Sequence, residues 1–209
     1  MKAALRNVRD SIRHRLLYRK WLRAGMEDPP PHRAKVKIVQ EYATRFSIQT
    51  LVETGTYLGD MVYANKHRFQ TIISIELDRA LYERAKERFR RYPHVRIVHG
   101  DSGTVLPMVL KTVVGSCLFW LDGHYSGSGT AKGSSETPIL NELLHIKSHG
   151  DDHVILIDDA RLFQGTNDYP ALDELRSFSQ GLWQRSTFDV QYDIIRICPA
   201  RPVPQGTIV

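Results

Sequence analysis

Residues 48–76 read IQTLVETGTYLGDMVYANKHRFQTIISIE and introduce the pattern that runs through the rest of the chain. Two apolar, β-branched runs, 48–53 and 71–76, enclose a glycine-containing turn and a helical stretch near 59–68. Strands that are apolar along their whole length and are separated by helices form parallel sheets that are covered on both faces. This stretch therefore predicts an α/β fold.

The same alternation continues toward the C-terminus. Further strands are predicted at 95–99, 117–122 and 153–158, and helices at 79–91, 103–111 and 137–148. Two last strands, near 187–191 and 193–198, lie too close together for a crossover helix, so they predict a hairpin with at least one antiparallel strand. We expect a Rossmann-like, doubly wound, mostly parallel seven-stranded sheet with an antiparallel strand in its C-terminal hairpin.

The composition is that of an ordinary globular protein. The 209 residues are 42% hydrophobic and 25% charged, and no apolar run is long enough to span a membrane. The N-terminus lacks the pattern of a secretory signal. Cys117 and Cys198 lie in apolar runs, which indicates buried thiols rather than a disulfide framework. We expect a cytoplasmic protein.

The positive charge is concentrated at the N-terminus. Residues 1–24 contain eight Lys or Arg and one acid, a net +7, whereas the whole chain carries +6. Leu5, Val8, Ile12 and Leu16 recur at helical spacing, so this segment predicts an amphipathic basic helix. A second helix is expected over 33–46.

We therefore divide the chain into a basic helical arm or lid, 1–46, and a ligand-binding domain, 47–209. Peripheral contact of residues 1–24 with an anionic membrane, docking on a partner protein and closure over the ligand pocket all stay open for the arm. Homo-oligomer formation is left open as well.

In an open α/β sheet, ligands bind beyond the carboxyl ends of the strands. Gly55 and Gly59 follow the first predicted strand and allow close approach of the backbone to a ligand. The second strand ends in Glu76, which could accept hydrogen bonds from ribose hydroxyls. The third runs into Asp101 and Ser102. Taken alone, the glycines are explained equally well by a simple strand–helix turn, and Glu76 is better explained as a solvated loop acid, but the order of the signals is specific.

This order, together with the terminal hairpin, resembles the class I S-adenosylmethionine (SAM)-dependent methyltransferases over residues 48–199. The resemblance implies SAM as the cofactor. It implies Gly55 and Gly59 under the methionine part, Glu76 at the ribose, and Asp101 with Ser102 at the adenine. The other cofactor-binding residues that it implies are Glu53, Thr54, Asp60 and Asp122, with Thr54 and Asp60 near the amino acid moiety.

Three further carboxylates are expected at the same edge of the sheet. Asp122 follows the fourth strand, and Asp158 and Asp159 follow the fifth. Such carboxylates repel one another unless a cation or protons intervene, and an all-oxygen site suits Mg²⁺ or another hard divalent cation. The alternative is that one or two of them cap helices.

This second pattern resembles the metal-dependent O-methyltransferases, such as catechol and macrocin O-methyltransferases and the related cephalosporin hydroxylase group. The resemblance implies that Asp122, Asp158 and Asp159 hold the metal. Catechol-type enzymes place a catalytic Lys where this chain has Tyr125. His124, whose ordinary pKa lies near neutrality, is the preferred general base, and a structural role is its alternative. The Gly/Ser-rich segment 126–137 is either a lid or a plain loop.

The sequence therefore predicts a SAM-dependent methyltransferase that methylates a hydroxyl group of a small molecule (a sugar, diol or catechol) with the help of a divalent metal. The alternative is a hydroxylase-like or non-enzymatic cofactor-binding protein of the same fold, whose basic arm docks on a membrane or partner. A nucleic-acid methyltransferase is disfavoured because the arm has only Tyr18 and Trp21 as aromatics and no Asn-Pro-Pro-Tyr-like motif follows the fourth strand.

Overall fold

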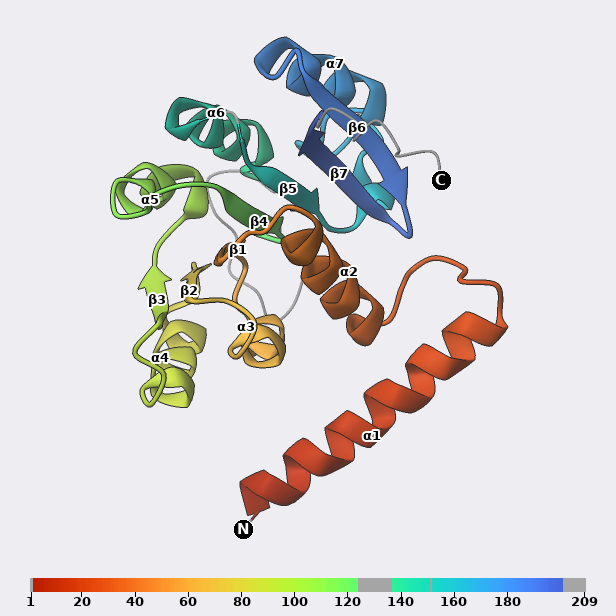
Figure 1. Ribbon diagram of the computed structural model, residues 1–209, viewed down its shortest axis with the longest axis vertical. Coiled ribbons are helices and arrows are strands. Elements are labelled where there is room, and N and C mark those ends of the chain that lie inside the picture. Colours follow the sequence, from red (N-terminus) through yellow and green to blue (C-terminus); the bar gives the residue numbers. More distant parts are fainter. Residues whose placement is uncertain (1, 124–136, 151, 201–209) are drawn as a thin grey trace, which may run out of the picture.

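The computed structural model describes residues 2–123, 137–150 and 152–200, with the side chains from residue 13 onward. Seven strands form one sheet in the order β3-β2-β1-β4-β5-β7-β6 (Figure 1). The strands are β1 (Thr50–Thr54), β2 (Thr71–Glu76), β3 (Val95–His99), β4 (Cys117–Leu121), β5 (Val154–Ile157), β6 (Ser186–Gln191) and β7 (Ile194–Pro199). Strands β1 to β5 are parallel, and β7 runs antiparallel to both β5 and β6. The predicted fold class is confirmed.

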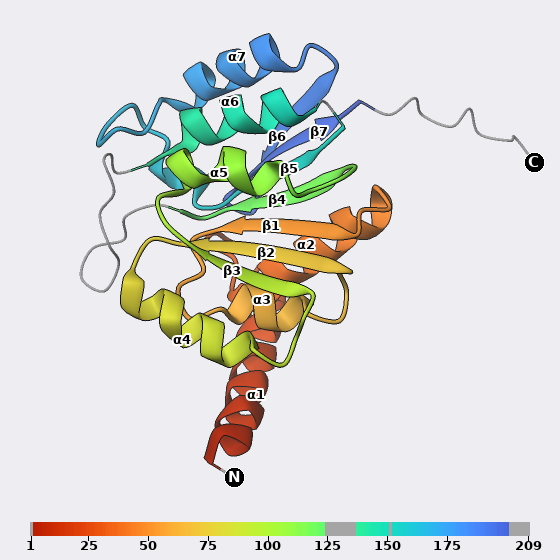
Figure 2. The ribbon, with the colours of Figure 1, turned by 90° about the vertical axis from the view of Figure 1, so that its left-hand side faces the viewer.

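Helices cover both faces of this sheet. Figure 2 shows α5, α6 and α7 on one face and α2, α3 and α4 on the other. The helices are α1 (Lys2–Arg23), α2 (His32–Arg45), α3 (Asp60–Asn65), α4 (Arg79–Phe89), α5 (Ser102–Leu110), α6 (Ile139–His149) and α7 (Leu172–Leu182), with a short 3₁₀ helix, η1 (Ala160–Leu162). The sheet is thus the middle of three layers.

The two-sided burial explains why the central strands are apolar at every position. In β4, Phe119 and Leu121 pack into the cluster under α5 to α7, whereas Leu118 and Trp120 pack into the cluster under α2 to α4. All four side chains are at most 2% exposed. Successive side chains of a strand point to opposite faces, so a strand with a helix layer on each side needs apolar residues throughout.

One helix was not predicted. Segment 172–182 forms α7, whose Leu175 is fully buried against the sheet. Leu172, Leu175, Phe178 and Leu182 recur at helical spacing, so the signal was present in the sequence. The start of the helix is stabilised by Glu174, whose carboxylate accepts a 2.8 Å hydrogen bond from the backbone N–H of Ala171.

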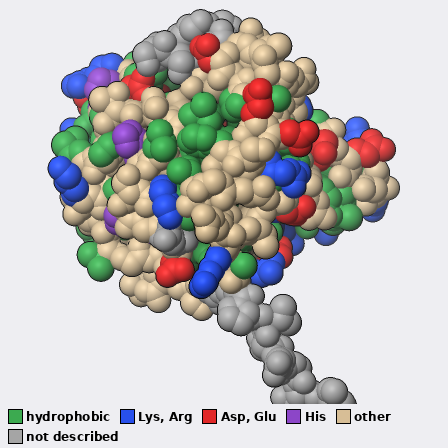
Figure 3. Space-filling model, turned by 90° about the horizontal axis from the view of Figure 1, so that it is seen from above, with side chains coloured by type: hydrophobic (Ala, Val, Ile, Leu, Met, Phe, Trp, Pro, Cys, Tyr) green, Lys and Arg blue, Asp and Glu red, His purple; other side chains and the backbone are tan. Residues whose placement is uncertain are grey.

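The N-terminal segment forms two different helices. Helix α2 packs into the core through Val36, Val39 and Ala43. Helix α1 extends from it, and its Leu16 is 60% exposed. None of the described helices combines the length and apolar composition needed to span a membrane. Seen from above in Figure 3, the surface of the molecule carries both basic and acidic side chains. Residues 1–24, in contrast, carry a net charge of +7.

The division of the chain at residue 46 stays a prediction, as do its oligomeric state and cytoplasmic location.

The two cysteines provide a test of the core. Burial raises the pKa of Cys117 and that of Cys198 to about 12, and both thiols are free. Because the thiolate is the reactive form, we expect neither thiol to react with a disulfide reagent such as Ellman's reagent in the native protein at about pH 8. Both should react in denaturant. Rapid labelling of either cysteine without denaturant would contradict this packing.

Candidate functional site

The carboxyl ends of the central strands meet at one edge of the sheet. Thr54 at the end of β1 pairs in register with Ile75 of β2 and with Leu121 of β4. Leu121 in turn pairs with Ile157 of β5. The residues that follow these strands therefore start from the same edge, which brings together the glycine loop, Glu76 and the acidic residues predicted from the sequence.

The glycine loop after β1 lies directly against the loop after β4. Gly55 has a φ of +84°, and a Cβ atom built on it would lie 2.3 Å from the backbone oxygen of Asp122. Gly59, with a φ of +75°, precedes α3, and a Cβ there would lie 2.7 Å from the ring of Phe89. Both positions therefore require glycine, for backbone conformation and for space.

Thr54 places a hydroxyl group in this junction. Its Oγ1 is buried and, among the described residues, has no hydrogen-bond partner. A Cβ built on Gly123 would lie 3.0 Å from this oxygen and 3.3 Å from Oγ of Ser102, so both hydroxyls lie close to the backbone after β4. Leaving a buried hydroxyl unsatisfied costs about 1–3 kcal/mol. A polar ligand bound at this edge would remove that cost, which fits the predicted cofactor.

Glu76 lies beside the glycine loop with its residue only 6% exposed. Its Oε2 accepts a 2.6 Å hydrogen bond from the backbone N–H of Tyr57, and its Oε1 accepts one of 2.9 Å from that of Asp78. Burial raises the pKa of Glu76, although these backbone donors oppose the rise. A carboxylate has about four acceptor positions, so Glu76 can still accept hydrogen bonds from two ribose hydroxyls.

Two other residues predicted to bind the cofactor, Asp101 and Asp60, interact with other parts of the protein. Asp101 caps α5 by accepting a 2.9 Å hydrogen bond from the backbone N–H of Gly103. Asp60, half exposed, forms a 2.9 Å ion pair with Arg88. It also lines a cavity of about 360 Å³ between α1, α2 and α3, together with His14 and His32. Their contacts with a cofactor stay predictions.

Glu53 is buried below the glycine loop at 2% exposure. Its carboxyl accepts a hydrogen bond from the Ser74 hydroxyl. Burial raises the pKa of Glu53 well above its ordinary value of 4.5, and the nearby carboxylates of Asp122 and Glu76 add to the rise. The observed contact is with β2, and a role in cofactor binding stays a prediction.

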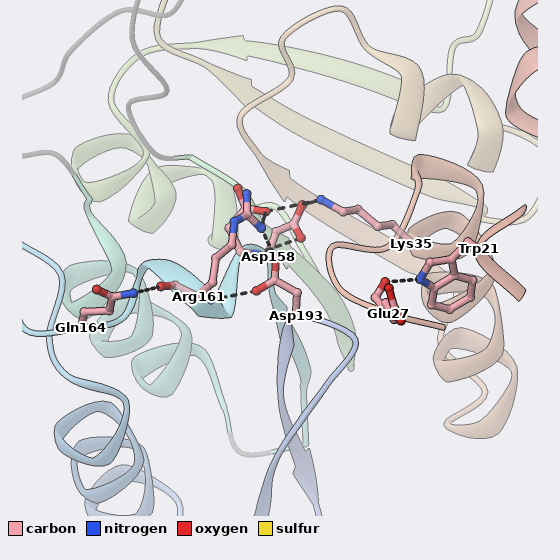
Figure 4. A network of polar contacts seen from close by, with 8 residues as sticks. Trp21, Glu27, Lys35, Asp158, Arg161, Gln164 and Asp193 are labelled. Carbon is pink, nitrogen blue, oxygen red and sulfur yellow. Dashed lines mark hydrogen bonds and ion pairs between the residues drawn. The ribbon is translucent and has the colours of Figure 1, made fainter. Parts of the chain in front are cut away.

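The acidic residues after β5 contact a cation that sequence reasoning missed. The ammonium group of Lys35, on α2, forms an ion pair with Oδ2 of Asp158, and its Nζ lies 3.6 Å from Oδ1 of Asp159 (Figure 4). On the other side, Nη1 of Arg161 donates to Oδ1 of Asp159 at 2.8 Å and also contacts Asp193. Lys35 is 123 residues from Asp158 in sequence, and no local sequence motif predicts the contact.

This arrangement bears on the predicted metal. Within the described ranges, no group of three His, Cys, Asp or Glu side chains is placed to hold a metal ion. Asp158 and Asp159 instead contact Lys35, so these carboxylates, as arranged, do not fit a divalent cation. Assignment of Asp122, Asp158 and Asp159 to a metal stays a prediction. His124 and Tyr125, the predicted catalytic residues, lie outside the described residues, as does segment 126–136 of the predicted lid.

Solved structures of known proteins share the fold of this chain, although sequence comparisons find no match. No protein-family model matches the chain, and no curated protein sequence matches it. Solved structures do. An O-methyltransferase from Streptomyces achromogenes involved in tomaymycin synthesis, in complex with SAM, is 15% identical with a TM-score of 0.57, covering 87% of this chain and 86% of its own.

Two further structures are similar. A Podospora anserina methyltransferase bound to SAH is 17% identical with a TM-score of 0.55, covering 82% of this chain and 80% of its own. A putative caffeoyl-CoA O-methyltransferase from Staphylococcus aureus is 13% identical with a TM-score of 0.55, covering 92% and 98%. The chain therefore has the fold of class I SAM-dependent methyltransferases, which confirms the resemblance at the level of fold.

The contact at Gly55 can be tested with a matched pair of variants. Gly115 has a φ of +80° but no atom within 4 Å of a built Cβ. Gly115→Ala should therefore lower the free energy of unfolding by only about 1–2 kcal/mol, the cost of a side chain in a left-handed backbone conformation. Gly55→Ala should lower it by a further amount of about 1–3 kcal/mol, because its methyl group overlaps the backbone of Asp122. Urea unfolding would measure both losses. Equal losses in the two variants would contradict the close approach at Gly55.

The buried carboxyl of Glu53 makes stability depend on pH. Its pKa is raised in the folded protein, so the folded state holds one more proton above the ordinary value of 4.5. The free energy of unfolding should therefore fall as pH rises, by up to about 1.4 kcal/mol per unit, until the folded pKa is passed. Glu53→Gln should flatten this dependence. Urea unfolding between about pH 5 and 8 would measure this pH dependence, and Glu83→Gln, at an exposed position, is the control. If the difference in stability between Glu53→Gln and the wild type did not change with pH, the raised pKa of Glu53 would be contradicted.

Proposed function

We propose that this chain is a SAM-dependent methyltransferase that transfers a methyl group to a hydroxyl oxygen of a small molecule. The observation that carries the proposal is the buried Glu76 carboxylate beside the Gly55 loop, at the edge where β1, β2 and β4 end. A buried acceptor at the end of the second strand, next to a loop of close backbone approach, suits a nucleoside. The unsatisfied hydroxyl of Thr54 adds a second polar group at the same edge.

When bound, the cofactor supplies an activated methyl group on a positively charged sulfur. The residues of this chain then have to bind and orient the two reactants, which is the main protein contribution to an in-line displacement. Glu76 holds the ribose, and the backbone at Gly55 supports the methionine part. The carboxylate of Glu76 at the same edge favours the positive sulfur.

A hydroxyl acceptor is supported by two observations. The residues after β4 are Asp122, Gly123, His124 and Tyr125, with no amino-methylating Asn-Pro-Pro-Tyr-like motif. Two of the similar structures are described as O-methyltransferases, one of them putative. A sugar, diol or catechol is the proposed class of acceptor, and His124 remains the proposed general base.

Assistance by a divalent metal was part of the sequence-based expectation. Three carboxylates after β4 and β5 support it as oxygen ligands. The ion pairs of Lys35 with Asp158 and Asp159 oppose it, because the ammonium already supplies a positive charge there. Transfer of the methyl group in the proposed reaction therefore does not depend on a metal ion.

The basic arm favours a second role, contact with an anionic membrane surface. On α1, Leu16, Leu17 and Leu22 are 60%, 43% and 44% exposed, and Arg15 and Arg19 are exposed beside them. Exposed apolar and basic side chains on one helix are typical of interfacial helices. Such a contact would place the proposed enzyme at a surface, and the nucleic-acid alternative gains no support from the arm.

Calorimetric titration with S-adenosylhomocysteine tests the proposed function. We expect the wild type to bind, and Glu76→Ala to weaken binding by about 1–3 kcal/mol, because hydrogen bonds to a charged group are lost. The exposed acid Glu83 on α4 provides the matched control, since Glu83→Ala should bind like the wild type. Absence of binding to the wild type up to about millimolar ligand would contradict the proposal.

A further inference from the structure

We propose that Lys35 is the built-in cation of the acidic cluster formed by Asp122, Asp158 and Asp159, and that it takes the place of a divalent metal at the edge where the methyl acceptor binds. The role toward the acceptor rests on the proposed function. The role toward the carboxylates rests on the contacts of Lys35 alone.

The position of Lys35 is determined by the packing of α2. Lys35 precedes Val39 by one helical turn, so both side chains lie on the same side of the helix. Val39 and Ala43 are fully buried, and they fix α2 against the sheet. Lys35 therefore reaches the carboxyl end of β5 from a rigid element, and its placement does not depend on a flexible loop.

The ion pairs are shielded from solvent. The side chain of Lys35 is 18% exposed, that of Asp158 is 2% exposed and that of Asp159 is 14% exposed. Charges in such surroundings are screened much less by salt than surface pairs are. Removing one partner of a buried pair leaves an uncompensated charge, which destabilises the folded state. The carboxylates therefore need a cation in this position.

Lys35 is charged at neutral pH. Burial lowers the pKa of Lys35, but attraction to Asp158, and then to Asp159 and Asp122, outweighs burial and leaves the pKa above its ordinary value of 10.5. Lys35 contacts Asp158 and Asp159 directly, and Asp122 starts next to Asp158 because Leu121 and Ile157, the residues before them, pair in register. A divalent cation would have to displace the ammonium group of Lys35 from Asp158.

Asp159 is held from a second side as well. Its backbone lies in the left-handed region, with a φ of +57° that non-glycine residues rarely adopt. The ion pair with Arg161 and the contact of Arg161 with Asp193 keep it in place. Such strained residues persist only where their surroundings hold them. A metal ion would compete with Arg161 for Asp159 in addition to competing with Lys35.

An ammonium group can perform one task of a metal at this position. It carries three donor protons, and the contact with Asp158 uses one of them. The others are available to the acceptor oxygen, where they would stabilise the negative charge that this oxygen carries once its proton has been removed and before the methyl group is transferred. Lys35 thus supplies the positive charge beside Asp158 and Asp159 and presents a hydrogen-bond donor at the proposed acceptor site.

Binding of Mn²⁺ to the full chain tests this inference without knowledge of the acceptor. Electron paramagnetic resonance of free Mn²⁺ would be recorded during titration of the wild type, Lys35→Gln and Lys35→Met. We expect weak, non-saturating binding to the wild type and at least about tenfold tighter binding to either variant, or about 1.4 kcal/mol. The reason is that both variants keep most of the length of the side chain and leave Asp158 without the ammonium group that pairs with it.

Three further variants complete the experiment. Lys35→Arg should restore exclusion of Mn²⁺, because it retains the positive charge. The double variant Lys35→Gln with Asp158→Asn should lose the gained affinity. Lys37→Gln, on the exposed part of the same helix, is the matched control and should behave like the wild type.

Two results would overturn the inference. One is micromolar binding of Mn²⁺ to the wild type that Asp158→Asn abolishes, since the metal would then displace Lys35. The other is unchanged Mn²⁺ affinity in folded Lys35→Gln and Lys35→Met, where thermal melting establishes folding.

Titration with S-adenosylhomocysteine separates these outcomes from failure of the proposed function, because the wild type should bind it equally with chelator and with Mg²⁺. Loss of that binding alone would remove the proposed function and leave the Mn²⁺ result standing.

Discussion

The parallel pairing of β1 with β2 on one side and with β4 on the other is the constraint on which the site depends. At this central strand the order of the sheet reverses, and the loops that leave its two neighbours diverge to opposite faces. Ligands of open α/β sheets bind where loops diverge in this way, and the close contact of Gly55 with the backbone of Asp122 lies at this point. Any ligand at this edge therefore meets residues from several strands at once.

The same constraint brings carboxylates together, and the structure relieves their repulsion in three different ways. Glu53, the most enclosed, has a raised pKa and a hydroxyl donor in Ser74. Glu76 accepts from two backbone N–H groups. Asp158 pairs with the ammonium of Lys35. The three environments differ in what stabilises the acid: burial with one hydroxyl donor for Glu53, two backbone donors for Glu76, and an ammonium group for Asp158.

The N-terminal segment has a larger part in the site than its place in the sequence indicates. Helix α2 is packed in the core, and it supplies both Lys35 at the acidic cluster and His32 at the cavity beside Asp60. Helix α1, in contrast, exposes leucine and arginine side chains. The two helices of the predicted arm thus differ in their described side chains: α2 buries an apolar face in the core, whereas residues 13–23 of α1 expose several leucines.

The sequence by itself determined the layers, the parallel strands and the edge at which the candidate site residues gather, because strand periodicity and strand-end residues are local signals. It also contained the helical spacing of α7, which went unused. The partners of the charged groups were decided only by the tertiary structure. Asp101 caps α5, and Lys35 meets Asp158 across 123 residues. Such contacts depend on how α2 packs against the sheet, and packing of distant segments leaves no spacing in the sequence from which a partner can be read.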